Sequence, residues 1–239
     1  TLVKALKANG MTILTTSHLL ADAEDICDRV MIVNHGKTVA EDSSGLADMI
    51  QGMEIAVGVR DSDTGTWTCQ NLTDNDVVDM APHLKMAANG SAAVVWMRNP
   101  GNGIAGTKDA PSDLMMAFYR NGAWSEVKTV VPQAGVVTAY DVAYDGSNFC
   151  LAYALDDDGD ISTRDDEEIW SVSGTASRWG EPKRLTTDEV EDSRPYVWHA
   201  NGAVQMAWLH DQKLMTGTLN AGMDEFASTN LFAAISPAG

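Results

Sequence analysis

The sequence is poor in basic residues and in long apolar runs, and each shortage excludes a class of protein. Only 16 of its 239 residues are lysine or arginine, against 34 aspartates and glutamates, which gives a net charge of −18. This charge repels phosphate backbones, so we expect no nucleic acid among its partners. No run approaches the roughly 18 apolar residues of a membrane-spanning helix, and the opening residues lack the charged segment and apolar core typical of a signal peptide. We also expect both ends to have been cut from a longer reading frame.

Cysteine is scarce too, which excludes the common cysteine-based sites. Cys27, Cys69 and Cys150 lie at wide, unequal spacings and include no Cys-x-x-Cys pair. Three cysteines so placed form neither a zinc pattern nor an even set of disulfides. We therefore expect three buried thiols.

The first fifty residues alternate between helical and strand patterns. The run "MTILTT" is typical of a buried strand, and Ser17 can cap a helix whose apolar residues, from Leu19 to Val30, recur at helical spacing. Strands "VMIV" and "KTVA" follow around an "NHG" turn, and Ser43 or Ser44 opens a last short helix through Ile50. The pattern predicts an α/β fragment over residues 1–52.

This ordered set resembles the C-terminal end of the ATP-binding-cassette (ABC) ATPase domain over about 50 of the 239 residues. In that family a strand ending in Ser-His is followed by a helix, "CDRV", a strand, an "NHG"-like turn and "KTVAE". The resemblance implies that His18 is the switch histidine, or H-loop, which contacts the γ-phosphate and helps to place the attacking water. It also implies a transporter membrane subunit and a second ATPase subunit as partners, at the cytoplasmic face of a membrane.

The rest of an ATPase site is missing from the chain. No G-x-x-x-x-G-K-[ST] loop occurs to cradle phosphates. The family's Leu-Ser-Gly-Gly-Gln motif and the acidic pair that holds Mg²⁺ are absent as well. We expect no ATP hydrolysis by this chain alone, so ATP and Mg²⁺ are expected cofactors only of a complete ATPase.

Residues 53–239 carry an internal repeat with a period near 56, and each unit holds about four short strand-like runs. A repeat of this length with four strands is typical of a β-propeller blade. We predict an all-β, incomplete β-propeller of about three to four four-stranded blades, approximately 53–112, 113–167, 168–212 and a partial 213–239. The matched positions are Leu72 with Leu185, Asp79 with Asp192, Pro82 with Pro195, Gly90 with Gly202, and Trp96 with Trp208.

The run "SDTGTW", residues 62–67, is similar to the Asp-box hairpin of sialidase-like propellers, although it is one residue short. A retaining sialidase needs an arginine cluster, a tyrosine nucleophile and an acid. Nothing in the sequence selects such a set, so we do not expect sialidase or glycosidase activity. Aromatic faces suit sugar rings, but recurrence at blade spacing favours packing in the core or in hairpins. The tryptophans concerned are Trp67, Trp96, Trp124, Trp179 and Trp208.

Three polar residues are the better ligand candidates. His83 and Tyr196 follow the shared Asp-x-x-Pro, and Asp141 is their approximate equivalent in the middle unit. An innermost strand would begin there, beside the mouth of a channel, where a protein or glycan ligand could bind. The alternative is that these residues have no function.

An acidic run, "LDDDGDISTRDDEE" at residues 155–168, concentrates carboxylates around a glycine, as calcium loops do. The EF-hand register is broken. A propeller-type calcium loop of Asp156, Asp158 and Asp160 is one interpretation. The other is a solvated hairpin tip whose charges oppose edge-to-edge aggregation.

The two parts of the chain allow two main functional hypotheses. In the first, an ABC transporter ATP-binding subunit carries a cytoplasmic propeller that binds a partner. In the second, the propeller is a non-enzymatic extracellular module for glycans or proteins, and the ATPase remnant was joined to it by accident or recent fusion. A weaker third hypothesis makes the N-terminal piece a generic α/β cap on the propeller.

Overall fold

The computed structural model describes residues 30–34, 37–42, 53–160, 163, 165–188 and 190–234. Within these ranges the regular elements are all strands, which confirms the all-β prediction for the larger part. The described residues include no helix long and apolar enough to cross a membrane.

The α/β class predicted for residues 1–52 is not borne out by the described part of that region, which holds strands alone. β1 (Val30–Asn34) and β2 (Lys37–Asp42) form the predicted antiparallel pair. Val30, placed at the end of a helix by its spacing, is the first residue of β1 because it pairs with Asp42. The two expected helices lie outside the described residues.

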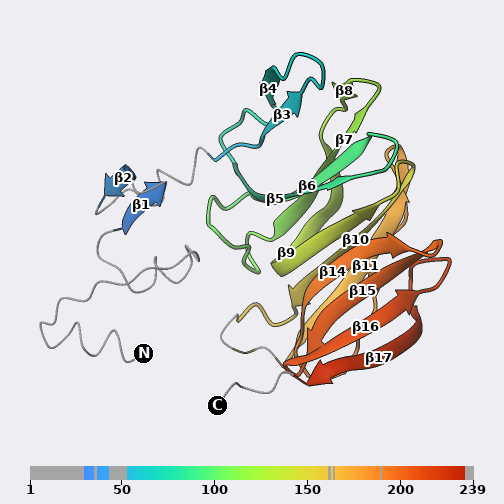
Figure 1. The fold of residues 1–239 in the computed structure, drawn as a ribbon. Helices are drawn as coiled ribbons and strands as arrows, with labels where there is room; N and C mark the ends of the chain where they lie inside the picture. Colours follow the sequence, from blue (N-terminus) through green and yellow to red (C-terminus); the bar gives the residue numbers. More distant parts are fainter. Residues whose placement is uncertain are drawn as a thin grey trace, which may run out of the picture.

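The remaining strands form three further sheets, none of which closes into a ring within the described residues. They succeed one another along the molecule from β3 to β17 (Figure 1). A hairpin consists of β3 (Ala56–Arg60) and β4 (Trp67–Asn71). A four-stranded sheet consists of β14 (Asp192–Ala200), β15 (Ala203–His210), β16 (Lys213–Leu219) and β17 (Phe226–Ala234).

The largest sheet has nine strands in the order β12-β11-β10-β9-β7-β6-β5, with β8 paired to β7 and β13 to β11. Its strands are β5 (Val78–Met86), β6 (Ala92–Asn99), β7 (Ser112–Arg120), β8 (Ala123–Trp124), β9 (Lys128–Tyr144), β10 (Asn148–Asp156), β11 (Glu167–Thr175), β12 (Arg178–Trp179) and β13 (Lys183–Arg184).

The 17-residue strand β9 joins two separate meanders into this one sheet. Its residues up to Gly135 pair with β7, and its residues from Val136 onward pair with β10. The first meander is therefore β5, β6, β7 and the first half of β9. The second meander is the other half of β9, β10 and β11, edged by β12 and β13. The sheet of β14–β17 is the third.

The apolar core lies between successive meanders. Phe118, Tyr144 and Phe149 belong to the cluster that joins the first to the second, and Ile169 and Met206 to the cluster that joins the second to the third. Strands β6 and β10 are buried along nearly their whole length, on both faces. This explains why "AAVVW" and "FCLAY" are continuous apolar runs instead of alternating ones.

The β3–β4 hairpin departs from the expected burial. Trp67 is 62% exposed and Cys69 is also exposed, because this hairpin pairs only with itself within the described residues. Cys150 is buried as predicted, and burial raises the pKa of its thiol to about 12. Cys27 lies outside the described residues. Of the other recurring tryptophans, Trp96 and Trp208 are buried, while Trp124 and Trp179 are partly buried against apolar clusters.

The junction within β9 can be tested by Gly135→Ala. Gly135 has a φ of +111°, and a Cβ there would lie 2.8 Å from Leu155 Cδ1. We expect the variant to lose about 2 kcal/mol of unfolding free energy in urea titrations, because an L side chain is strained at that φ. The control is Gly180→Ala, whose Cβ would meet only Ser173 O, at 3.9 Å. If both variants lost the same unfolding free energy, the positive φ at Gly135 would not be the reason for its sensitivity.

Candidate functional site

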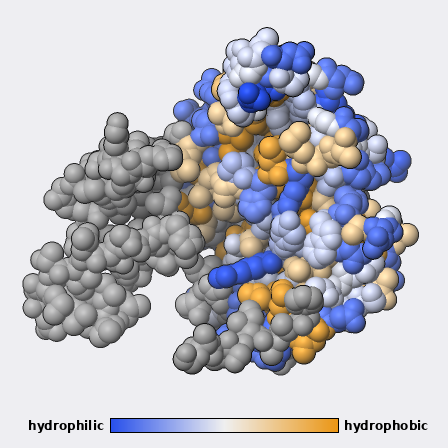
Figure 2. All heavy atoms as spheres, in the orientation of Figure 1, coloured by the Kyte–Doolittle hydropathy of each residue, from blue (hydrophilic) through white to orange (hydrophobic). Residues whose placement is uncertain are grey.

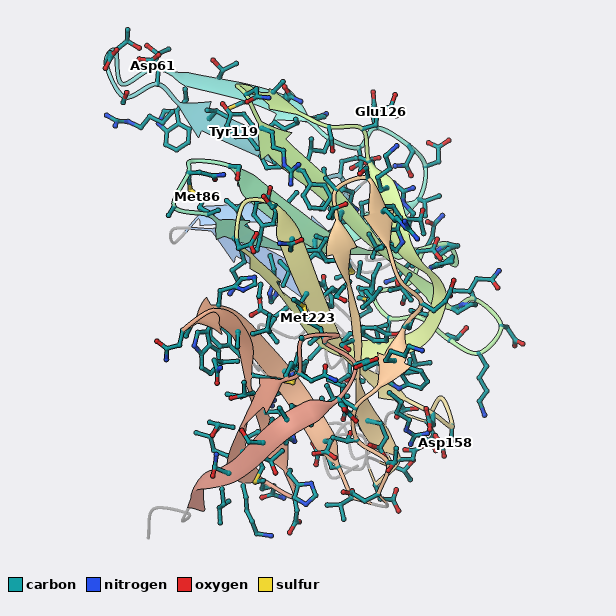
Figure 3. All side chains as sticks on the ribbon, turned by 90° about the vertical axis from the view of Figure 1, so that its right-hand side faces the viewer. Asp61, Met86, Tyr119, Glu126, Asp158 and Met223 are labelled. Carbon is teal, nitrogen blue, oxygen red and sulfur yellow. The ribbon has the colours of Figure 1, made fainter. Side chains whose placement is uncertain are left out.

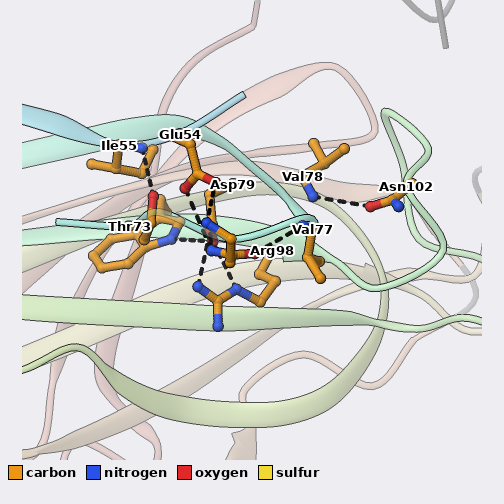
Figure 4. Close-up of polar contacts among 10 residues, drawn as sticks. Glu54, Ile55, Thr73, Val77, Val78, Asp79, Arg98 and Asn102 are labelled. Atoms are coloured by element: carbon orange, nitrogen blue, oxygen red, sulfur yellow. Dashed lines mark hydrogen bonds and ion pairs between the residues drawn. The ribbon is translucent and has the colours of Figure 1, made fainter. Parts of the chain in front are cut away.

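A buried aspartate is the first or second residue of the first strand in two of the three meanders. In β5, Asp79 Oδ1 accepts hydrogen bonds from Trp96 Nε1 at 2.6 Å and from Arg98 Nε at 2.8 Å (Figure 4). In β14, Asp192 Oδ1 accepts one from Trp208 Nε1 at 2.7 Å and lies 3.0 Å from His210 Nδ1. The aspartates therefore bind the first strand of each meander to the second.

A bulge follows each aspartate. Ala81 and Arg194 have φ values of 54° and 53°, and the pairing register shifts between Met80 and His83 and between Ser193 and Tyr196. Each positive φ precedes the proline that the two repeats share. Bulges redirect the side chains beside them. His83 and Tyr196 are the first residues to resume pairing, and both are exposed.

The three predicted ligand residues come together, although they are far apart in the sequence. His83 Nδ1 lies 3.4 Å from Asp141 Oδ1. Lys85 Nζ lies 3.1 Å from Asp141 Oδ2 and 4.3 Å from the centroid of the Tyr196 ring. We call His83, Lys85, Asp141 and Tyr196 the His83 cluster. Its members come from β5, the second half of β9 and β14, the first strand of each meander.

Backbone contacts hold these strands in place around the cluster. The Tyr140 hydroxyl donates to Ala81 O at 2.5 Å, which attaches β9 to the bulge of β5. Val197 N donates to Asp141 Oδ2 at 3.1 Å, which attaches β14 to β9. Burial raises the pKa of Tyr140, so its hydroxyl keeps its proton for this bond.

Asp141 is a charged anchor inside the cluster. Its side chain is only 3% exposed. Burial alone would raise the pKa of this carboxyl, but donors from His83, Val197 N–H and Lys85 outweigh burial, and the pKa lies below its usual value. Both oxygens face protein donors. Asp141 therefore orients His83 and Lys85 and is not free to receive a ligand.

The surface of the cluster consists of donors beside an aromatic ring. Tyr196 is 54% exposed, His83 is nearly half exposed and Lys85 is partly exposed. A second ring, Trp198, lies 5.7 Å from Tyr196 between centroids. Such a surface can donate hydrogen bonds to an acceptor-rich ligand and offer it an apolar face.

Sequence reasoning missed Lys85. The available signal was the alternation of β5, because residues two apart on a strand point to the same side. Once His83 is placed beside Asp141, Lys85 must follow on the same face. Tyr140, which is adjacent to Asp141 in the chain, was not among the predicted site residues either.

The predicted calcium ligands are only partly together. Asp156 and Asp158 gather with Asp166, and one oxygen from each lies within 4.8 Å of the others. Asp160 is not in this group. Backbone N–H groups already occupy several of the oxygens: Gly159 N donates to Asp156 Oδ1 at 2.6 Å and Asp158 N to Asp166 Oδ2 at 2.7 Å. The group lies at the tip of the β10–β11 hairpin, across the molecule from Met86 (Figure 3).

Two further features lie away from the predicted ligand residues. Asp188, Asp192 and His210 form a second group with ligand atoms within 4.8 Å, which the sequence did not suggest. A pocket of about 440 Å³ lies beside the β3–β4 hairpin, lined by residues that include Arg60, Tyr119 and Trp124. No member of the His83 cluster lines it. His18, the predicted switch histidine, lies outside the described residues.

Comparison with known proteins finds the ABC resemblance over a short segment. No family model matches the chain. An uncharacterized ABC transporter ATP-binding protein of Nostoc sp. is 36% identical over 66 residues, 28% of this chain and 18% of that protein. Another from Synechocystis sp. is 32% identical over 80 residues, 32% of this chain and 22% of that protein. The chain thus spans about a fifth of the length of these relatives and resembles them over a short segment.

The structural neighbours include a glycoside hydrolase and a sialidase. A family 117 glycoside hydrolase of Zobellia galactanivorans matches with a TM-score of 0.46 and 11% identity, over 75% of this chain and 62% of its own. Trypanosoma rangeli sialidase matches with a TM-score of 0.41 and 12% identity, over 77% of this chain and 34% of the sialidase chain. Fold likeness does not transfer activity. The function must follow from the site itself.

The charge on Asp141 can be tested through the pH dependence of stability. Because its pKa is lowered on folding, its contribution is complete above the unfolded value of about 3.9 and disappears as pH falls through the folded value. We expect Asp141→Asn to cost about 2 kcal/mol of unfolding free energy at pH 7. The difference from the unmodified chain should shrink as pH falls below about 4, as judged from denaturant titrations.

The difference in unfolding free energy between Asp141→Asn and the unmodified chain isolates Asp141, because the other acids that titrate over this range contribute equally to both proteins. Asp109→Asn, at an exposed position, is the matched control and should leave the stability unchanged at every pH. A loss for Asp141→Asn that stays constant with pH would show that the charge is not what stabilises the site.

Proposed function

We propose that residues 53–234 form a binding module of blade-like meanders, and that this module binds carbohydrate at the His83 cluster without cleaving it. The observation that carries the proposal is the convergence of three first strands on one buried, charged carboxylate. Asp141 holds donors from β5 and from the β14 backbone at once. This arrangement fixes exposed groups in position before any ligand arrives.

The exposed chemistry suits a sugar. Pyranose rings present an apolar face of C–H groups and a rim of hydroxyl oxygens. The Tyr196 ring, more than half exposed, can cover the first, and the N–H groups of Lys85 and His83 can donate to the second. Because Lys85 carries a positive charge, a sugar with a carboxylate should bind better than a neutral one.

Cleavage is not part of the proposal, because Asp141 does not suit the role of a catalytic acid. A glycosidase needs one carboxylic acid that is protonated and faces the bond to be broken. Asp141 has a lowered pKa, and protein donors face both of its oxygens. It supports a site that holds a ligand.

Binding can be measured on the full chain with an array of neutral and carboxylated oligosaccharides. We expect retention of carboxylated members, followed by Kd measurement by calorimetry on the best of them. Lys85→Ala should weaken that binding roughly tenfold, because it removes a charged hydrogen bond worth about 1.5 kcal/mol or more. Tyr196→Ala should weaken the binding of neutral and carboxylated sugars to the same extent.

Lys128→Ala is the matched control, since the Lys128 side chain is partly exposed and pairs only with Glu126 among the contacts described. Its affinity should equal that of the unmodified chain. If no sugar binds, or if Lys85→Ala and Tyr196→Ala bind as well as the control, the proposal fails.

The similarity to ABC ATP-binding proteins supports a second proposal, which concerns residues 1–52. This segment is the end of a cassette ATPase whose phosphate loop and magnesium-binding acids are absent from the chain. The module would then be the partner-binding part of a transporter subunit at the cytoplasmic face of a membrane. The other hypothesis, an extracellular module, uses the same sugar-binding surface.

The second proposal predicts that the purified chain releases no phosphate from ATP in the presence of Mg²⁺. The reason is that the sequence contains no P-loop motif, whose backbone amides and lysine would hold the phosphates. A malachite-green phosphate assay measures this directly. His18→Ala should leave the baseline unchanged, whereas hydrolysis lost on that substitution would mean that the chain holds a working site.

A further inference from the structure

The networks around Asp79 and Asp192 occupy matching places in two meanders but differ in charge. In the first meander, Arg98 Nη2 and Asn75 Nδ2 donate to Asp79 Oδ2, at 2.8 and 2.9 Å. Together with Trp96 Nε1 and Arg98 Nε, they satisfy both oxygens of the carboxylate. The arginine cancels its charge.

In the third meander, Asp188 and His210 replace these two donors. Asp188 precedes Asp192 by four residues, as Asn75 precedes Asp79. His210 pairs directly across from Asp192, as Arg98 pairs across from Asp79. The third meander therefore has a carboxylate and an imidazole at the positions where the first meander has an amide and a guanidinium.

This replacement leaves a buried oxygen without a donor. The Asp192 side chain is 0% exposed, and Asp192 Oδ2 accepts no hydrogen bond from any described residue. Burying a carboxylate without a compensating charge is costly. His210 contacts only the other oxygen, and Asp188 adds a second negative charge beside the first.

We propose that Asp188, Asp192 and His210 bind a divalent transition-metal ion, for which zinc is the best match. One nitrogen and two carboxylate groups are a ligand set that zinc accepts, whereas magnesium and calcium prefer oxygen alone. The ion supplies the positive charge that Arg98 supplies in the first meander.

The distances between the ligand atoms agree with such an ion. His210 Nδ1 lies 3.0 Å from Asp192 Oδ1 and 3.9 Å from Asp188 Oδ2. Tetrahedral zinc with bonds of about 2.0–2.2 Å places its ligand atoms roughly 3.3–3.6 Å apart, between these two values. The Trp208 N–H donates to Asp192 Oδ1 and orients the carboxylate, as outer partners of metal ligands do. Asp188 is exposed, so the ion can enter from solvent.

Calorimetric titration of the chelator-treated full chain with ZnCl₂ is the first test. We expect one zinc per chain. At a hundredfold excess over Kd, the melting midpoint should rise by about 5 °C or more. MgCl₂ should give no comparable rise. An unmodified chain that binds no zinc would overturn the proposal.

The chain offers its own matched variant. Asp188→Asn combined with His210→Arg restores the residue types of the first meander, where they satisfy the same buried aspartate, so the variant should fold. It should lose zinc binding, and its melting midpoint should no longer respond to zinc. Asp158→Asn, in the acidic β10–β11 hairpin, should bind zinc like the unmodified chain. Retention of the same affinity in the double variant would place the zinc elsewhere and reject the site.

Discussion

The hydrogen bond between a buried aspartate and a buried indole is the contact on which the described architecture depends. Asp79 and Trp96 make it in the first meander, and Asp192 and Trp208 make it in the third. A carboxylate inside a core must find its donors, so this bond fixes the register of the first strand against the second. The bulge that follows is positioned by that register. The bulge in turn exposes His83 and Tyr196, and the candidate ligand site is therefore a consequence of a bond in the core.

The stacking of meanders explains which apolar residues remain exposed. Strands β6 and β10 lie between neighbours and are buried on both faces, whereas β5 has exposed residues on both faces from Ala81 to Leu84 and again at Met86. Leu84 and Met86 are exposed apolar residues of this strand. Figure 2 shows apolar side chains interspersed with hydrophilic ones on the face in view. These apolar residues of β5 are exposed because, in the described part of the chain, no complete meander precedes β5 to cover them.

Most of the strands, and part of the site, could be predicted from residue patterns. Continuous apolar runs indicated strands buried on both faces, and comparison of the chain with itself matched Asp79 to Asp192 and Trp96 to Trp208. His83, Asp141 and Tyr196 followed from their place after the shared Asp-x-x-Pro. Lys85 did not, because a lysine on a strand most often faces solvent and no repeat marks it.

Other features depend on contacts that no local pattern carries. Gly135 reads as a turn residue, yet β9 continues through it, because its two halves pair with different partners. Asp166 replaces Asp160 in the acidic group because the hairpin brings the chain back beside Asp156. Trp67 resembles the other recurring tryptophans in sequence, but no meander covers its hairpin in the described part of the chain.

The shortage of cations noted in the sequence gives the buried carboxylates unequal environments. Arg98, Lys85 and Arg184 pair with Asp79, Asp141 and Glu168, each of which is buried. Among the described residues, Asp192 has donors only from a histidine and an indole. Burial raises its pKa, and the donors from His210 and Trp208 do not offset this effect. The charged form of Asp192 is thus less well stabilised than that of Asp141, whose pKa is lowered. Donors from His83, Val197 N–H and Lys85 lower the pKa of Asp141, whereas burial and the nearby charge of Asp188 raise that of Asp192, so two carboxylates at similar depth differ in how well the core stabilises their charge.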